Sequence, residues 1–115
     1  MATRTFSKSK LLACRQCPKR LWLEVHRPEL RQESGAAEAR FQAGYRVGEI
    51  ARRLYDPDGV GVVIDVAQEG FDRAFARSLE LLATPQPIFE AGFSAAGALA
   101  FADVLLPLEK SRACA

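Results

Sequence analysis

Hydrophobic residues recur every three or four positions through most of the chain, which predicts amphipathic helices. A first helix is predicted over residues 7–25, with the hydroxyl of Ser7 as its N-cap. Pro18 lies inside this stretch and lacks a backbone donor, so it either interrupts the helix or divides it in two. Two further helices are predicted over residues 36–54 and 70–83. The stripe of the last helix that should face the core consists of Phe71, Phe75, Leu79 and Leu82.

Other segments have the composition of β-strands. Residues 60–66 are β-branched and apolar, which is typical of a strand buried on both faces. Residues 88–94 and 99–106 flank the turn Ala96-Gly97, and together they predict a β-hairpin. Alternation in the first of these strands places Ile88, Glu90 and Gly92 on one face and Phe89, Ala91 and Phe93 on the other. The predicted order is α-α-β-α-β-β, an α/β fold with a mixed sheet (α+β) in a single domain of 115 residues.

The composition is that of an ordinary globular protein, with 49% hydrophobic and 26% charged residues. No apolar run approaches the roughly 20 residues needed to cross a bilayer. The first ten residues contain no apolar signal core, so we expect no secretory peptide and a cytoplasmic location. The three cysteines are then expected to be reduced.

The net charge of +2 conceals an uneven distribution. Residues 1–31 hold eight basic and two acidic residues, a net +6, whereas the remainder holds eight basic and 12 acidic residues, a net −4. A basic segment on an acidic body suits a polyanion, and it equally suits a solvated helix face. The residues of this segment that would contact nucleic acid are Lys8, Lys10, Arg15, Lys19 and Arg20.

Cys14 and Cys17 form a Cys-x-x-Cys pair that can share a metal or cluster. A tetrahedral zinc site needs two more ligands, for which His26 and Cys114 are the available candidates. The alternative is that both cysteines are small buried hydrophobic residues on a helix. A thioredoxin-like role is not indicated, because the pair does not follow a strand.

Several motifs match a known family. They are Ser7-Lys8-Ser9-Lys10-Leu11, Cys17-Pro18-Lys19-Arg20-Leu21-Trp22-Leu23, His26-Arg27-Pro28-Glu29-Leu30, Gly44-Tyr45-Arg46-Val47-Gly48-Glu49-Ile50-Ala51-Arg52, Phe89-Glu90-Ala91 and Ala102-Asp103-Val104-Leu105. In this order and spacing the chain resembles a bacterial family of unknown function related to RecB-type nucleases and to CRISPR-associated RecB-like exonucleases. The Cys-Pro-Lys-Arg-Leu-Trp cluster is the most specific of these motifs.

The resemblance implies the N-terminal part of a PD-(D/E)xK nuclease fold that cuts DNA, single- or double-stranded, with Mg²⁺ or Mn²⁺. Asp103 matches the family's principal metal ligand, and Glu49 matches its helix carboxylate. Glu90 is a third catalytic candidate, because it can approach Asp103 across the hairpin. Asp103 lies in an apolar run, where a buried carboxylate would require a partner or a metal.

The sequence departs from the family after Asp103, where a strand carrying Glu-x-Lys is expected. Only Glu109-Lys110 follows, and adjacent strand residues point to opposite faces, so this pair does not replace the motif. We therefore expect a truncated family member or a fragment. Cys17, with Cys14 beside it, matches the early cysteine of an iron–sulfur site, but the later cysteine group is absent. A cluster is expected only in a longer parent protein.

Three functional hypotheses follow. The first is the N-terminal portion of a metal-dependent nuclease, inactive alone. The second is a non-catalytic nucleic-acid-binding module, in which Trp22 or Tyr45 stacks on bases if exposed and otherwise belongs to the core. The third is a non-functional remnant that self-associates through an exposed edge at residues 99–106.

Overall fold

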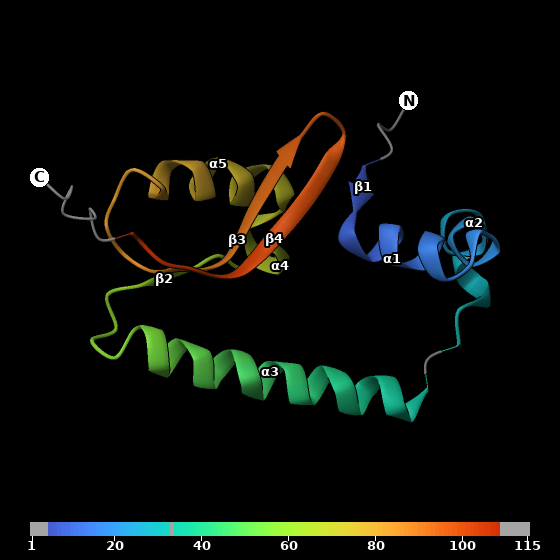
Figure 1. Cartoon of the computed structure of the whole chain (residues 1–115), viewed down its shortest axis with the longest axis horizontal. Coiled ribbons are helices and arrows are strands. Elements are labelled where there is room, and N and C mark those ends of the chain that lie inside the picture. The colour runs from blue at the N-terminus through green and yellow to red at the C-terminus, as the bar shows by residue number, and fades with distance from the viewer. Residues whose placement is uncertain (1–4, 33, 109–115) are drawn as a thin grey trace, which may run out of the picture. The chain divides into compact units, whose positions relative to one another are not determined.

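The computed structural model describes residues 5–32 and 34–108 (Figure 1). The elements in chain order are β1 (Phe6–Ser7), α1 (Lys8–Gln16), α2 (Pro18–His26), the 3-10 helix η1 (Pro28–Leu30), α3 (Gly35–Tyr55), β2 (Val62–Val63), α4 (Val66–Glu69), α5 (Phe71–Leu81), β3 (Ile88–Ala95) and β4 (Ala98–Leu105). The strands form one sheet in the order β1-β4-β3-β2, in which β1 runs parallel to β4 and β2 parallel to β3. The predicted α+β class with a mixed sheet is confirmed.

The chain divides into two compact units. Unit 1 comprises the chain up to Arg46 together with Ser94–Ala100, and unit 2 comprises Val47–Phe93 together with the chain from Phe101 onward. The helix α3 and the hairpin of β3 and β4 therefore contribute residues to both units. Along the described residues, no helix is both long enough and apolar enough to span a bilayer.

The helical part of unit 1 agrees with the sequence pattern. Ser7 caps α1, because its Oγ accepts a hydrogen bond from the Lys10 amide at 3.3 Å. Pro18 divides the predicted first helix and becomes the first residue of α2, where its missing N–H costs no hydrogen bond. The sequence pattern gave no sign of β1, which is only two residues long. Its Phe6 amide donates to the carbonyl of Gly97 at 2.7 Å.

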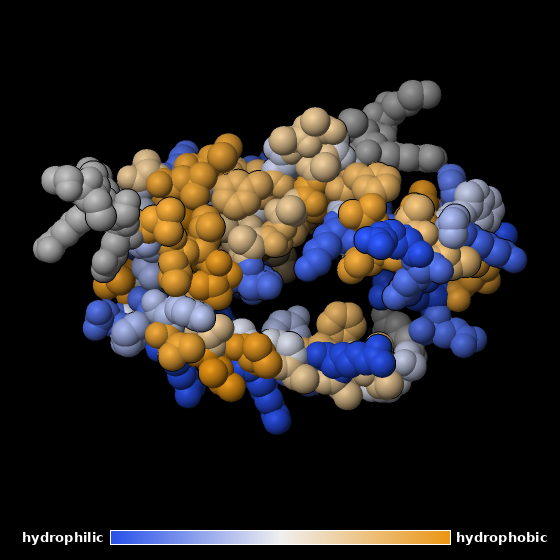
Figure 2. All heavy atoms as spheres, in the orientation of Figure 1, coloured by the Kyte–Doolittle hydropathy of each residue, from blue (hydrophilic) through white to orange (hydrophobic). Residues whose placement is uncertain are grey.

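The buried core of unit 2 is small. Ile64, Ala74, Ile88 and Ala91 form its buried cluster, and five partly buried side chains pack around it. These five are Val62, Val66, Leu81, Phe93 and Leu105. Figure 2 shows apolar side chains gathered over α5 and the hairpin.

The predicted core stripe of α5 is wrong for three of its four residues. The exposed fractions are 55% for Phe71, 62% for Leu79 and 52% for Leu82. The buried residues of α5 are Ala74 and Ser78, because close packing of this helix selects its small side chains. Three large aromatic rings pack on one another beside that contact, with centroid distances of 6.0 to 6.3 Å. These rings belong to Phe71, Phe75 and Phe101.

The predicted strand over residues 60–66 is also wrong in its extent, since only Val62–Val63 pair with β3. Before it, the Asp56 carboxylate accepts hydrogen bonds from the amides of Val60 and Gly61 at 2.9 and 2.8 Å, which fixes a loop. After it, Asp65 caps α4 by accepting from the Ala67 amide at 3.0 Å. Both carboxylates compete with strand pairing for the backbone amides.

The predicted β-hairpin is confirmed. Ala96 and Gly97 connect β3 to β4 and both have positive φ, 50° and 78°. Two consecutive residues of this kind form the turn that matches the right-handed twist of paired strands.

Candidate functional site

The most unusual backbone position of unit 2 is Glu90, in the middle of β3. Its φ is +59°, in the left-handed region that non-glycine residues rarely occupy. The Phe89 carbonyl accepts from the Ile64 amide at 3.0 Å, and the Gly92 amide donates to Ser78 Oγ at 3.0 Å. In a regular strand, the backbone groups of residues three apart point to opposite edges. Since the Phe89 carbonyl points to β2, the Gly92 amide would be expected to point to β4. It bonds instead to Ser78 on α5. From the positive φ and the redirected Gly92 amide we interpret Glu90 as the position of a β-bulge in β3.

The bulge overturns the predicted alternation of faces in β3. Ile88, Phe89, Ala91 and Gly92 are all buried, whereas Glu90 between them is exposed. Alternation predicts one buried residue in two, but the extra residue resets the pattern at Glu90. The consequence is an exposed residue whose carboxylate is still partly desolvated by its neighbours, in a strand that is otherwise buried at its start.

Packing against α5 holds the bulge in place. Ser78 is fully buried, and its Oγ donates to the Ala74 carbonyl at 2.7 Å while accepting from the Gly92 amide. A Cβ at Gly92 would lie 2.7 Å from Phe101 Cε1 and 2.9 Å from Phe75 Cδ1, so only glycine fits there. The strand cannot slip without breaking these contacts.

Asp103 on β4 acts electrostatically on Glu90. Desolvation raises the pKa of the Glu90 carboxyl above its usual range, the negative charge of Asp103 raises it further, and the Arg52 guanidinium opposes both. The structure thus brings together two of the three predicted catalytic carboxylates. Asp103 itself is exposed, so the expectation that it needs a partner because it is buried is wrong.

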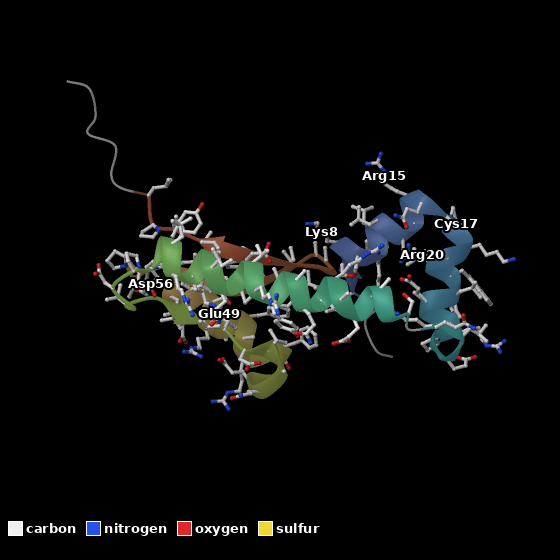
Figure 3. All side chains as sticks on the ribbon, turned by 90° about the horizontal axis from the view of Figure 1, so that it is seen from below. Lys8, Arg15, Cys17, Arg20, Glu49 and Asp56 are labelled. Atoms are coloured by element: carbon white, nitrogen blue, oxygen red, sulfur yellow. The ribbon has the colours of Figure 1, made fainter. Side chains whose placement is uncertain are left out.

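Glu49 has a different environment on α3 (Figure 3). Its side chain is 62% exposed, and its Oε1 accepts from Arg53 Nη2 at 3.3 Å. No group of three or more His, Cys, Asp and Glu residues arranged for a metal occurs within residues 5–32 and 34–108. Sequence reasoning missed Arg52 as the cation that acts on Glu90. No local pattern links Arg52 to Glu90, because the two residues lie on different elements, α3 and β3, that only folding brings together.

Glu90 and Asp103 are the two carboxylates that could hold a divalent cation in unit 2. Mg²⁺ is commonly held by one or two carboxylates together with water and substrate phosphate oxygens. Glu90 and Asp103 are carboxylates of this kind, and the pKa of Glu90 is raised first by desolvation and then by the negative charge of Asp103. Glu49, held by Arg53, is not placed with them by any contact in the described structure.

The basic residues of unit 1 fall into two groups. Lys8, Arg15 and Lys19 are exposed on α1 and α2, and the Arg15 side chain extends away from the ribbon in Figure 3. Lys10 is half-buried and donates to the Thr5 carbonyl at 2.8 Å, and Arg20 pairs with Glu24 at 2.8 Å. Of the five predicted nucleic-acid contacts, Lys8, Arg15 and Lys19 are therefore exposed and make no side-chain hydrogen bond or ion pair with the described residues.

The aromatic and sulfur residues of this segment are largely accessible. Trp22 is 55% exposed, so it is not a core anchor, and its ring packs against His26 at a tilt of 35° with a centroid distance of 4.9 Å. Cys14 is half-buried and Cys17 is exposed at the start of α2. His26 lies at the other end of that helix, roughly 13 Å along its axis from Cys17, too far to share a metal with it. Cys114, the other proposed ligand, lies outside the described residues.

Comparisons with protein-family models, curated proteins and solved structures find no match for this chain, so its function is argued from its own residues.

Proposed function

We propose that this chain is the N-terminal portion of a RecB-like, metal-dependent nuclease of the PD-(D/E)xK type that acts on DNA and is inactive alone. The observation that supports the proposal is the pair of carboxylates Glu90 and Asp103 on the adjacent strands β3 and β4. Glu90 lies at the strained bulge of β3. Strained backbone and β-bulges concentrate at functional sites, where they aim a side chain.

In this proposal Glu90 and Asp103 hold Mg²⁺ or Mn²⁺. Such a cation would activate a water and neutralise charge on the scissile phosphate. Arg52 moderates the repulsion between the two carboxylates while the site is empty of substrate. The exposed cations Lys8, Arg15 and Lys19 supply the phosphate contacts. The sequence contains no Glu-x-Lys, so the water-positioning lysine of the family has no counterpart here.

The test is cation binding to the full chain, measured by Mn²⁺ titration in a calorimeter and by Mn²⁺ broadening of amide resonances. We expect broadening centred on Glu90 and Asp103, and weakening of about tenfold or more in Asp103→Asn and Glu90→Gln. Because the pKa of Glu90 is raised, a larger share of its carboxyl is protonated just above the usual carboxyl range. Affinity should therefore rise with pH through that interval, and the Glu90→Gln variant should lose this dependence.

Two carboxylates provide matched controls. Glu49→Gln should leave Mn²⁺ affinity unchanged, since Arg53 holds Glu49, and Glu80→Gln on α5 should do the same. Equal effects of Asp103→Asn and Glu80→Gln would overturn the two-carboxylate site. Metal-dependent DNA cleavage by this chain alone, lost in Asp103→Asn, would contradict its inactivity while supporting the nuclease assignment.

A second candidate function is nucleic-acid binding without catalysis. It is favoured by the exposed Trp22 and the three projecting cations of unit 1, and it needs no metal. DNA binding that is the same with Mg²⁺ and with a chelator, in a chain that binds no Mn²⁺, would support this candidate over the nuclease.

A further inference from the structure

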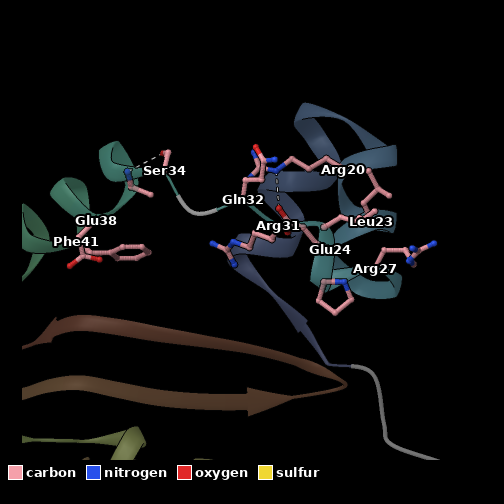
Figure 4. Close-up of a pocket in the computed structure, with 12 residues that line it drawn as sticks. Arg20, Leu23, Glu24, Arg27, Arg31, Gln32, Ser34, Glu38 and Phe41 are labelled. Atoms are coloured by element: carbon pink, nitrogen blue, oxygen red, sulfur yellow. Dashed lines mark hydrogen bonds and ion pairs between the residues drawn. The ribbon is translucent and has the colours of Figure 1, made fainter.

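A cleft of about 510 Å³ lies within unit 1, between α2 and η1 on one side and the first turns of α3 on the other (Figure 4). Its volume lies within the range of small-molecule sites, roughly 300 to 1,000 Å³. Of the five predicted nucleic-acid contacts, Arg20 lines it. The cleft is separate from the carboxylates of unit 2, since all its lining residues belong to unit 1.

The cleft combines positive charge with an apolar surface. Arg20, Arg27 and Arg31 line it, against the two acidic residues Glu24 and Glu38. Both carboxylates already accept hydrogen bonds, Glu24 from Arg20 at 2.8 Å and Glu38 from Gln42 at 3.0 Å. Arg20 is thereby paired with Glu24, and Arg27 pairs with Glu29 outside the lining, so among the described residues Arg31 is the lining arginine without an ion-pair partner.

Arg31 is the cation best placed for a ligand. Arg27 pairs with Glu29, whereas Arg31 is exposed and makes no ion pair with any residue in the described ranges. In Figure 4 the side chain of Arg31 extends away from α2 toward α3. A guanidinium in this position offers a forked set of donors, which fits the oxygens of a phosphate.

Apolar side chains line both sides of the cleft. The Phe41 ring on α3 is 57% exposed, and Leu30 on η1 is 56% exposed. Leu23 and Pro28 complete the apolar lining. Exposed aromatic rings beside cations bind nucleobases by stacking, with an energy that depends little on the base.

We propose that this cleft binds a nucleotide, with its phosphate at Arg31 and its base against Phe41. The nucleotide is either free or the phosphorylated end of a strand, because both present the same chemistry. The proposal does not depend on the carboxylate site, so either one can fail without the other.

The experiment titrates the full chain by calorimetry with four probes at low salt. The first two are adenosine 5′-monophosphate and adenosine. The other two are a single-stranded DNA hexamer with a 5′-phosphate and the same hexamer without it. The key variant is Arg31→Gln, and the matched control is Arg40→Gln, an exposed arginine on α3 outside the cleft lining. A second pair is Phe41→Ala with Tyr55→Ala, an aromatic residue at the end of α3 that is 48% exposed and lies outside the cleft lining.

We expect Arg31→Gln to weaken binding of the phosphorylated probes by about tenfold or more, and Arg40→Gln to change it less than about twofold. Phe41→Ala should weaken binding of all four probes, and Tyr55→Ala of none. Equal affinity for the mononucleotide and the phosphorylated hexamer supports a free nucleotide. A preference for the hexamer that disappears with its 5′-phosphate supports a strand end.

Two results would overturn the proposal. Adenosine binding as tightly as its monophosphate would show that no phosphate is recognised. Arg31→Gln behaving like Arg40→Gln would show that the cleft is not the site. Circular dichroism checks that each variant folds. Glu90→Gln and Asp103→Asn should leave nucleotide affinity unchanged, which separates this proposal from the metal site.

Discussion

At the scale of single residues, Glu90 has a backbone conformation that is unfavourable for a residue with a Cβ. A left-handed conformation costs a residue with a Cβ about 1 kcal/mol, and the charge of Asp103 adds repulsion. The surrounding contacts at Ser78 and Gly92 impose this conformation. Such a position is typical of a site selected for function at the expense of stability.

Comparison of Glu90→Gly with Glu90→Ala isolates the backbone strain, because both variants remove the carboxylate. We expect the glycine variant to be more stable by about 1 kcal/mol, since glycine adopts a φ of +59° without a Cβ clash. Urea denaturation followed by circular dichroism measures the difference. Equal stability, or a more stable alanine variant, would show that the bulge carries no strain.

At the scale of elements, one buried hydroxyl connects α5 to β3. Ser78 bonds to its own helix through the Ala74 carbonyl and to the sheet through the Gly92 amide. The bulge leaves the Gly92 amide without a strand partner, and Ser78 is what satisfies it. A buried amide without a partner is costly, so this contact determines how the helix sits on the strand.

Ser78→Ala should therefore lower the free energy of unfolding by about 1 to 3 kcal/mol, because the Gly92 amide remains buried without an acceptor. The matched control is Thr84→Ala, which removes a hydroxyl bonded to the Leu81 carbonyl at an exposed position. We expect this control to change stability by less than about 0.5 kcal/mol. Similar losses in the two variants in a thermal or urea melt would rule out a special role for Ser78.

At the scale of the whole molecule, charge is divided along the chain. The first 31 residues carry a net +6 and the rest a net −4. Polyanion binding through the basic segment releases counterions, so its affinity should fall steeply as salt is added.

In a salt titration of single-stranded DNA binding, followed by fluorescence anisotropy, Lys19→Gln should reduce the slope of log affinity against log salt by about 0.7. Lys19 is exposed on α2 and represents one phosphate contact. The control Arg73→Gln changes an exposed arginine on α5, in unit 2, and should leave the slope unchanged. Equal slopes for wild type and Lys19→Gln would exclude this contact, and a binding constant independent of salt would exclude the basic segment altogether.

The sequence by itself determined the elements whose signals are local. The Ser7 cap, the helix boundary at Pro18, the long helix α3 and the Ala96-Gly97 turn all depend on a few adjacent residues, and all are present in the structure. The placement of Glu90 and Asp103 on neighbouring strands likewise follows from the hairpin alone.

Only the tertiary structure decided which residues of those elements are buried and which chemistry they share. The small residues Ala74 and Ser78 face the core of unit 2 in place of the larger Phe71 and Leu79, because close approach of α5 to the sheet selects them. The bulge at Glu90 depends on Ser78, twelve residues earlier in the sequence, so no pattern within the strand reveals it. Periodicity records local spacing, whereas burial, strain and pKa are set by neighbours brought together by folding.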